Sequence, residues 1–144
     1  MKLWFNICYR LIKCIFSTKQ LIKRKLRMGE ITFFMTQMCY EKAKAIYPHS
    51  EMINNVAKHI SSEINMNVGS ARDYITDFFL MRNGKPLKHA MSESAAKYYF
   101  ECIYNDFGED ALTSALDSLQ FYLNYDKQNH PGLQDLINRF RENK

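Results

Sequence analysis

The sequence has little glycine and proline. Only 5 glycines and 3 prolines occur in 144 residues, and long stretches contain neither. A β-sandwich needs many turns, so this scarcity argues against such a fold and for helices. With 47% hydrophobic and 14% aromatic residues, the chain can still build a sizeable core. The composition favours one helical domain.

Cysteine pairs with metal-binding spacing are missing as well. The cysteines show no C-x-x-C pair and no histidine at ligand spacing, which a tetrahedral zinc site would need. We therefore expect no metal and interpret the cysteines as buried, reduced thiols. A cytoplasmic location follows as the default. The four residues are Cys8, Cys14, Cys39 and Cys102.

The sequence also lacks the residue groupings on which catalysis depends. Its 4 histidines are scattered, and none belongs to an H-x-x-x-H or H-E-x-x-H motif. No glycine-rich phosphate loop, no G-x-S-x-G motif and no acidic nuclease core is visible. Acidic side chains are common, but at positions typical of helix starts and solvated faces. We predict that the protein is not an enzyme and uses no cofactor.

Acidic residues are absent from residues 1–28. This segment carries eight basic side chains and a net charge of +8, whereas residues 29–144 carry 12 basic and 15 acidic side chains and a net charge of −3. We predict that residues 1–28 are a basic amphipathic extension of a single domain formed by residues 29–144. The apolar run from Leu3 to Phe16 is 14 residues long, too short for the roughly 20 that a membrane-spanning helix needs. No signal-peptide cleavage site follows it.

Three interpretations of this extension remain open. As a helix it would have an apolar and a basic face, which is typical of attachment to an anionic membrane surface. Further apolar residues widen the apolar face, so packing against protein fits equally well. The residues "MGEITFF", which begin at Met28, suggest instead that the preceding segment is dispensable. Periodicity does not decide among the three.

Apolar residues at helical spacing, separated by regular breaks, predict a compact all-α bundle of about five to six helices. The first helix, from about residue 37, should end at Tyr47, because Pro48 disfavours helix in the residue before it. We expect Ser50 to cap a second helix that runs through Glu63.

A capping pair predicts where the third helix begins. Ser70 and Asp73 match the S-x-x-D pattern, so we expect this helix to start at Ala71. It should end at "NG", where Gly84 can adopt the left-handed conformation of a C-cap. A basic loop follows it.

The remaining helices are separated by equally clear breaks. Ser92 is expected to cap a fourth helix that Gly108 ends. The fifth spans residues 109–126 and begins with acidic residues, as the helix dipole favours. The residues "HPG" break it, and a short closing helix covers residues 133–140.

The turn between the second and third helices suggests contact with nucleic acid. With its flanking helices, the turn "NMNV" resembles a helix-turn-helix, whose second helix presents N-terminal side chains to base edges. The loop "RNGKPLKH" contains no acid and could hold phosphates. Short polar turns also connect helices in every helical domain, so an ordinary connection is the alternative. The predicted DNA-contacting residues are Asn67, Ser70, Arg72, Arg82, Lys85, Lys88 and His89.

Residues 92–126 have the opposite charge. They contain one lysine, Lys97, against seven acidic residues, so this face should repel a duplex. It is also rich in tyrosine. These rings could stack unpaired bases, or they could lie at the edge of the core. The tyrosines are Tyr98, Tyr99, Tyr104, Tyr122 and Tyr125.

Three short motifs carry a resemblance to a known family. They are "NVGSARDYI" from Asn67, "MRNG" from Met81 and "YNDFG" from Tyr104. Over about residues 40–140 the chain resembles a small helical domain found N-terminal to HNH nuclease modules in bacterial restriction-type endonucleases. The resemblance implies a non-catalytic module attached to DNA cleavage.

The chain also departs from that pattern. Residues 87–90 read "LKHA" where such domains tend to read "Y-x-R-T", and residues 122–126 read "YLNYD" where they tend to read "H-I-x-Y-Y". Several polar groups of the family are thus missing. The 144 residues contain no HNH module.

Three function classes follow from these observations. We expect a non-catalytic, DNA-associated accessory module of a restriction, defence or mobile-element system. The alternative is a protein-interaction module, in which the acidic, tyrosine-rich face from Glu93 to Asp126 docks on a partner such as a nuclease. The third is membrane-surface association through residues 1–28. The sequence leaves the oligomeric state open.

Overall fold

The computed structural model describes residues 30–143 and shows a purely helical unit that begins at Ile31. No strand occurs in this part of the chain, so the all-α prediction is confirmed. The predicted extension of residues 1–28, with Cys8 and Cys14, lies outside the described residues. The elements are α2 (Phe33–Ile46), the 3-10 helix η1 (Ser50–Met52), α3 (Ile53–Ile64), α4 (Val68–Arg82), α5 (Glu93–Phe107), α6 (Glu109–Tyr125) and α7 (Pro131–Glu142).

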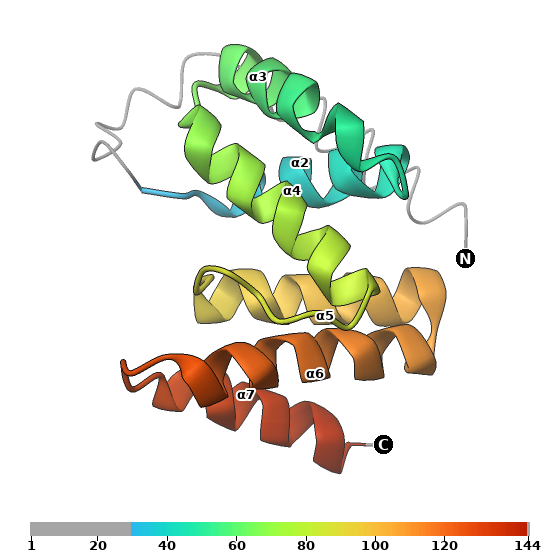
Figure 1. The fold of residues 1–144 in the computed structure, drawn as a ribbon, viewed down its shortest axis with the longest axis vertical. Helices are drawn as coiled ribbons and strands as arrows, with labels where there is room; N and C mark the ends of the chain where they lie inside the picture. The colour runs from blue at the N-terminus through green and yellow to red at the C-terminus, as the bar shows by residue number, and fades with distance from the viewer. Residues whose placement is uncertain (1–29, 144) are drawn as a thin grey trace. The chain divides into compact units, whose positions relative to one another are not determined.

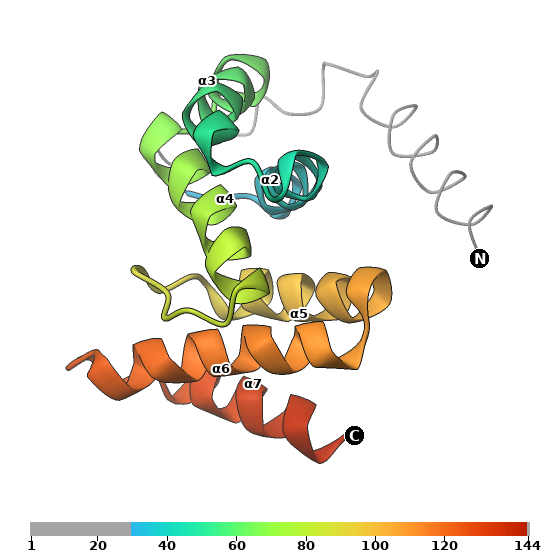
Figure 2. The ribbon, with the colours of Figure 1, turned by 45° about the vertical axis from the view of Figure 1, so that its right-hand side comes forward.

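The helices form two groups that α4 connects (Figures 1 and 2). In the first group α2, α3 and α4 pack on one another, and in the second α5, α6 and α7 lie side by side. The end of α4 reaches the second group, where the helix packs against α6. The loop of residues 83–92 then leads to α5. Every helix between residues 30 and 143 is too short or too polar to cross a lipid bilayer.

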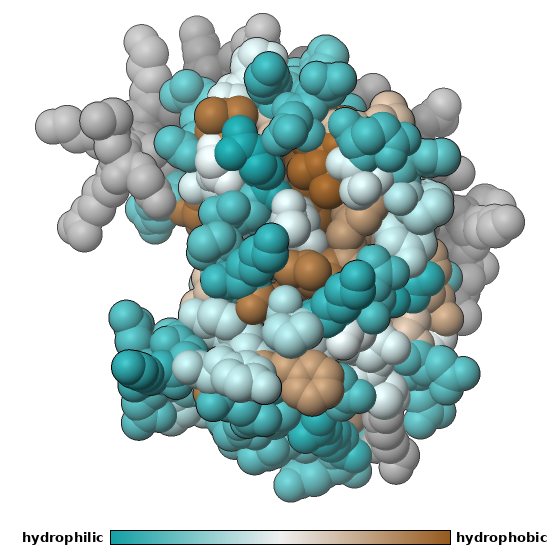
Figure 3. Space-filling model, in the orientation of Figure 1, coloured by the Kyte–Doolittle hydropathy of each residue, from teal (hydrophilic) through white to brown (hydrophobic). Residues whose placement is uncertain are grey.

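Hydrophobic residues are scattered over the face of the molecule drawn in Figure 3. That view shows a largely hydrophilic surface, with brown residues in small, separated patches. The apolar side chains of the described unit are instead gathered in one buried cluster to which all six α-helices contribute.

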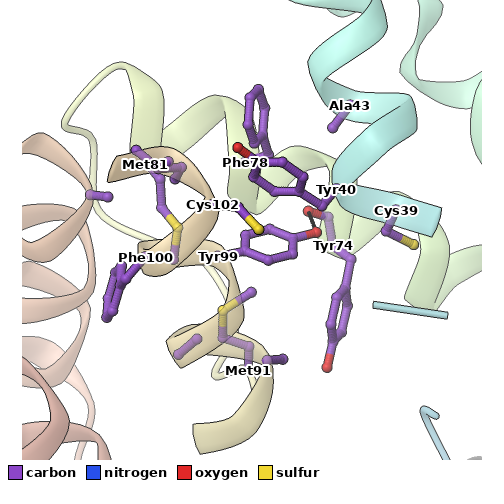
Figure 4. Packing of buried hydrophobic residues seen from close by; sticks show 14 of the residues in the cluster. Cys39, Tyr40, Ala43, Tyr74, Phe78, Met81, Met91, Tyr99, Phe100 and Cys102 are labelled. Atoms are coloured by element: carbon purple, nitrogen blue, oxygen red, sulfur yellow. Dashed lines mark hydrogen bonds between the residues drawn. The ribbon is translucent and has the colours of Figure 1, made fainter. Parts of the chain in front are cut away.

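The centre of this cluster is a group of aromatic rings contributed by α2, α4 and α5 (Figure 4). The ring of Tyr40 stands edge-on to the rings of Phe78 and Tyr99, with centroids 5.3 and 5.4 Å apart. Edge-to-face pairs of this kind add to the free energy gained by burial. The Tyr99 hydroxyl donates to the carbonyl oxygen of Tyr74 at 3.0 Å, so a fully buried polar group is satisfied.

Several predicted helix ends are confirmed. The Ser92 hydroxyl accepts from the Ala95 amide at 3.2 Å and caps α5. Gly84 follows α4 with a φ of 64°, the left-handed conformation expected of it. Cys39 and Cys102 are buried free thiols, as predicted. Burial raises the pKa of Cys39 to about 12 and that of Cys102 to about 11.

The predicted start of α4 is wrong. Asn67 caps this helix by accepting from the Ser70 amide at 3.1 Å, so α4 begins at Val68 and not at Ala71. Asparagine and serine cap helices equally well. The earlier start is consistent with the burial of Met66, which is 2% exposed in the preceding turn.

Two further predicted starts also differ from the structure. Ser50 caps no α-helix, because residues 50–52 form the 3-10 turn η1 and α3 starts only at Ile53. The first helix begins at Phe33 and not near residue 37, because the Thr32 side chain caps it by accepting from the Met35 amide at 3.2 Å.

Candidate nucleic-acid interface

The basic loop, defined as residues 83–91, is fastened to α6 at its middle. The Lys85 carbonyl oxygen accepts from the Ser118 hydroxyl, and the Leu87 amide donates to the Ser118 carbonyl oxygen at 3.3 Å. Leu87 and Met91 are 4% and 3% exposed, so both side chains point into the core. The loop therefore holds its charged residues in a defined place, although it has no regular secondary structure.

The two lysines of the basic loop are exposed and unpaired. Lys85 and Lys88 lie on the surface, and neither makes an ion pair with a described carboxylate. The backbone of Lys85 is bonded to Ser118, and Lys88 follows the buried Leu87, so both lysines belong to anchored parts of the loop while their side chains are exposed. The basic loop therefore carries two exposed lysines that form no ion pair with a described carboxylate.

The end of the basic loop returns to the beginning of α4. His89 Nε2 lies 3.8 Å from Asp73 Oδ1, and the exposed Arg72 is the neighbour of Asp73 in sequence. The structure therefore brings His89 to the first turns of α4, where it contacts Asp73. Arg82 is ten residues beyond Arg72 on α4, a separation of about 15 Å along the helix axis, so the predicted set is extended and does not form one cluster.

Arg82 is packed between aromatic rings. Its guanidinium carbon lies 3.9 Å from the ring centroid of Phe107 and 5.3 Å from that of Tyr47. Its Nε is buried and has no hydrogen-bond partner in the described chain. Cation–π contacts of this kind stabilise packing, so Arg82 fastens α4 to the ends of α2 and α5.

The helix α4 presents little surface to a groove of DNA. Asn67 is occupied as the N-cap, and Ser70 lies half-buried in the first turn. Arg72 is the one exposed residue of α4, since the helix packs against α2, α3 and α6. A recognition helix must offer several side chains to base edges. The arrangement of α3 and α4 therefore leaves α4 without the set of exposed side chains that base reading needs.

Asp77 is a buried carboxyl group that the sequence did not mark. It is 2% exposed, on the buried side of α4. Burial, and secondarily the charge of Asp73, raises its pKa to about 8. The group is therefore largely protonated at neutral pH.

The acidic residues of α5 and α6 are largely paired. Arginines of α7 lie 3.1 Å from Glu93 and Asp117, and Lys44 of α2 lies 3.1 Å from Asp106. Lys97 lies 3.8 Å from Glu101 on α5 itself. The predicted acidic face is thus much less negative than its sequence suggested.

Asp126 is the most firmly held of these carboxylates. It accepts from the Tyr122 hydroxyl at 2.7 Å, lies 2.8 Å from His130 Nε2, and accepts from the Gln128 amide at 3.1 Å. These contacts, that of Tyr122 first, lower the pKa of Asp126 to about 2. The carboxylate fixes the turn between α6 and α7.

Two shallow hollows open on the described surface. The loop hollow, of about 370 Å³, lies between the basic loop and the end of α6 and is lined by Pro86, Leu87, Lys88, Tyr122, Tyr125 and Asp126. The α5–α7 hollow, of about 580 Å³, is lined by residues of α5, α6 and α7 that include Lys97, Tyr104 and Arg139. Within residues 30–143, no three potential metal ligands are grouped closely enough to hold an ion.

Comparison with protein-family models, with curated proteins and with solved structures found no match to this chain. The resemblance to the helical domain that precedes HNH modules therefore stays a prediction from the sequence.

Proposed function

We propose that the protein is a non-catalytic, DNA-associated accessory module that acts in the cytoplasm. The observation that supports this proposal is that some exposed basic side chains form ion pairs with carboxylates and others do not. Arg72, Lys85 and Lys88 are exposed without a carboxylate partner, whereas Lys97, Arg139 and Arg141 are each paired with one. Cations that no carboxylate neutralises attract a polyanion.

Few phosphates can be contacted at this interface. With three exposed cations and the imidazole of His89, binding should be weak and should depend mainly on the negative charge of the phosphate backbone. If each contact contributes about −0.9 to the slope of log K against log salt concentration, three contacts give a slope of roughly −3. Sequence discrimination would be slight, because phosphate contacts carry no base information.

The biological setting rests on the resemblance alone. A module that accompanies HNH nucleases would serve a restriction, defence or mobile-element system by positioning a partner on DNA. The chemistry of cleavage would belong to that partner.

The test uses a full-length chain whose extension no longer carries charge, because eight positive charges would hide the contribution of the loop. We call this the tail-neutral protein. It has glutamine at Lys2, Arg10, Lys13, Lys19, Lys23, Arg24, Lys25 and Arg27.

In the tail-neutral protein, Lys85→Glu with Lys88→Glu should weaken duplex binding at least 10-fold at low salt, as measured by fluorescence anisotropy. The matched control, Lys42→Glu with Lys58→Glu, makes the same charge change on α2 and α3, and should weaken it less than about 3-fold. Equal losses in the two variants would show that net charge governs binding, and the proposal would fail.

The protein-interaction alternative is favoured by a different observation. Tyr104 is 52% exposed at the α5–α7 hollow, and Phe107 is 38% exposed one helical turn further on. A partner that docks there would cover both rings. Co-purification at fixed stoichiometry from a native host, abolished by Tyr104→Ala and unaffected by Lys88→Glu, would favour this function over DNA binding.

Membrane-surface association depends wholly on residues 1–28, which lie outside the described residues. It predicts that the unaltered chain sediments with anionic vesicles and that the tail-neutral protein does not.

A further inference from the structure

The loop hollow joins two features that lie far apart in the sequence. The basic loop forms one wall through Pro86, Leu87 and Lys88, and the end of α6 forms the other through Tyr122 and Tyr125. A lysine without an ion-pair partner and an exposed aromatic ring therefore line the same recess.

Tyr125 differs from the other tyrosines of α5 and α6. Tyr99 is fully buried, Tyr98 packs edge-on against Phe33, and the hydroxyl of Tyr122 donates to Asp126. The side chain of Tyr125 is 82% exposed and contacts no other ring of the described chain. It is the most exposed large hydrophobic residue between positions 30 and 143. Its flat face is free to receive another ring.

Three exposed lysines without ion-pair partners belong to the basic loop or follow Tyr125 closely in sequence. Lys88 lines the hollow itself, Lys85 precedes it on the loop, and Lys127 follows Tyr125 by two residues. All three are exposed, and none makes an ion pair with a described carboxylate. Asp126 is the one acidic residue in the lining, and its carboxylate is already held by Tyr122 and His130.

We propose that the loop hollow binds a single-stranded polynucleotide, with one unpaired base stacked on Tyr125 and the neighbouring phosphates held by Lys85, Lys88 and Lys127. This inference rests on the proposed function and narrows it to single strands. Base stacking on an aromatic ring requires a base that is not already stacked inside a duplex. An exposed ring that shares a hollow with an unpaired lysine suits such a strand, in which bases and phosphates alternate.

The experiment compares oligonucleotides of one length and sequence, single-stranded and duplex, in DNA and in RNA. Each carries one 2-aminopurine, whose fluorescence falls when the base stacks. With the tail-neutral protein, Tyr125→Ala should weaken single-strand binding about 10-fold and abolish the quenching, as expected for loss of one stacked base. Duplex binding should change less than 2-fold. Tyr125→Phe keeps the ring and should keep both signals.

A matched control is available at the other exposed tyrosine. Tyr104 lies on α5 in the α5–α7 hollow, where Lys97 and Arg139 are paired with acids. Tyr104→Ala should therefore leave single-strand affinity and quenching unchanged. A loss equal to that of Tyr125→Ala would overturn the inference.

The remaining outcomes separate this inference from the proposed function. If Lys85→Glu with Lys88→Glu weakens duplex binding but Tyr125→Ala leaves single-strand binding intact, the inference falls and the proposed function stands. If the tail-neutral protein binds no polynucleotide, both fall. Equally effective competition by poly-aspartate, with no quenching, would assign the hollow to an acidic peptide and overturn the inference. If Tyr125→Ala weakens binding of single-stranded DNA or RNA, the inference is supported. The nucleic acid whose affinity falls more, DNA or RNA, is then the preferred ligand.

Discussion

Two hollows on the described surface share an exposed tyrosine and differ in how their basic side chains are paired. Each is shallow and contains an exposed tyrosine, Tyr125 in the loop hollow and Tyr104 in the α5–α7 hollow. In the α5–α7 hollow the cations Lys97 and Arg139 are paired with acids, whereas Lys88 in the loop hollow is not. If the proposed function is correct, pairing, and not the number of basic residues, should determine which surface attracts a polyanion.

Helical geometry explains the difference. Positions four apart on a helix face one another, so Lys97 meets Glu101 on α5 and Arg139 meets Asp135 on α7. The basic loop has no such periodicity, and residues 82–92 contain no acid. Exposed ion pairs contribute little stability, but they cancel the surface potential around the α5–α7 hollow.

The largest expected effect concerns the buried carboxyl group of Asp77. Because the pKa of Asp77 in the folded protein, about 8, lies above its ordinary value of 3.8, the native state binds a proton that the unfolded state has released. Stability should therefore be greatest below pH 4 as far as this group is concerned, and fall as the pH rises towards 8.

Asp77→Asn removes this titration. The natural chain should lose about 1.4 kcal/mol of unfolding free energy per pH unit from pH 5 to about pH 8. The variant should not, so it should gain roughly 4 kcal/mol relative to the natural chain between pH 5 and pH 9. Urea unfolding at the two values measures it. Asp110→Asn, at an exposed site, is the control and should show almost no such change. A constant difference for Asp77→Asn would mean that the carboxyl is not buried as the structure has it.

A second prediction compares the contribution to stability of a packed arginine, Arg82, with that of an exposed one, Arg72. Arg82→Ala removes two contacts with aromatic rings and should lower the unfolding free energy by roughly 2 kcal/mol. Arg72→Ala, at an exposed position on the same helix, should change it by less than about 0.5 kcal/mol. Thermal unfolding compares the two. Similar losses in the two variants would contradict the packed position of Arg82. Because a substitution of Arg82 should destabilise the fold, it is a poor probe of DNA binding.

A third variant tests whether the basic loop is held in place. Ser118 is fully buried, and its hydroxyl donates to the Lys85 carbonyl oxygen. Ser118→Ala should cost about 1 kcal/mol and speed hydrogen exchange at the Lys85 and Leu87 amides. Ser114→Ala is the control, since that hydroxyl, one turn earlier on α6, makes no hydrogen bond within residues 30–143. Unchanged exchange in Ser118→Ala would show that the backbone hydrogen bonds and the buried side chains of Leu87 and Met91 are enough to hold the loop.

Local patterns were sufficient to predict the helices and most of their ends. The break at Pro48, the cap at Ser92 and the left-handed Gly84 each act within a few residues, so the sequence alone indicates them. The start of α4 was missed because Asn67 and Ser70 can both cap a helix. Local preference does not choose between them. The choice depends on how the preceding turn packs in the folded protein, which the local sequence does not indicate.

The candidate site was predictable only in part. The absence of acids in the basic loop was visible in the sequence, but the packing of Arg82 depends on Tyr47 and Phe107, 35 residues before it and 25 after it. Likewise, the pairing of Asp117 with Arg141 joins two helices. Contacts at such separations leave no periodic signal, so the charge of a surface could not be obtained by counting residues.

The smallest expected effect tests the comparison most directly. Replacing the carboxylates that pair with Lys97 and Arg139, by Glu93→Gln, Glu101→Gln and Asp135→Asn, should leave stability within about 1 kcal/mol, because exposed ion pairs contribute little. In the tail-neutral protein the change should raise affinity for heparin about 2- to 3-fold, because two cations lose their partners. The salt concentration needed for elution from a heparin column measures it.

The control for this variant removes the same number of negative charges where no ion pair is lost. Glu63→Gln, Asp110→Asn and Glu142→Gln lie at exposed positions that form no ion pair within the described chain. This control should raise the elution salt less than the variant with freed cations. If the two elute together, net charge alone governs attraction of a polyanion. The unpaired lysines of the basic loop would then have no advantage over the paired cations of α5 and α7.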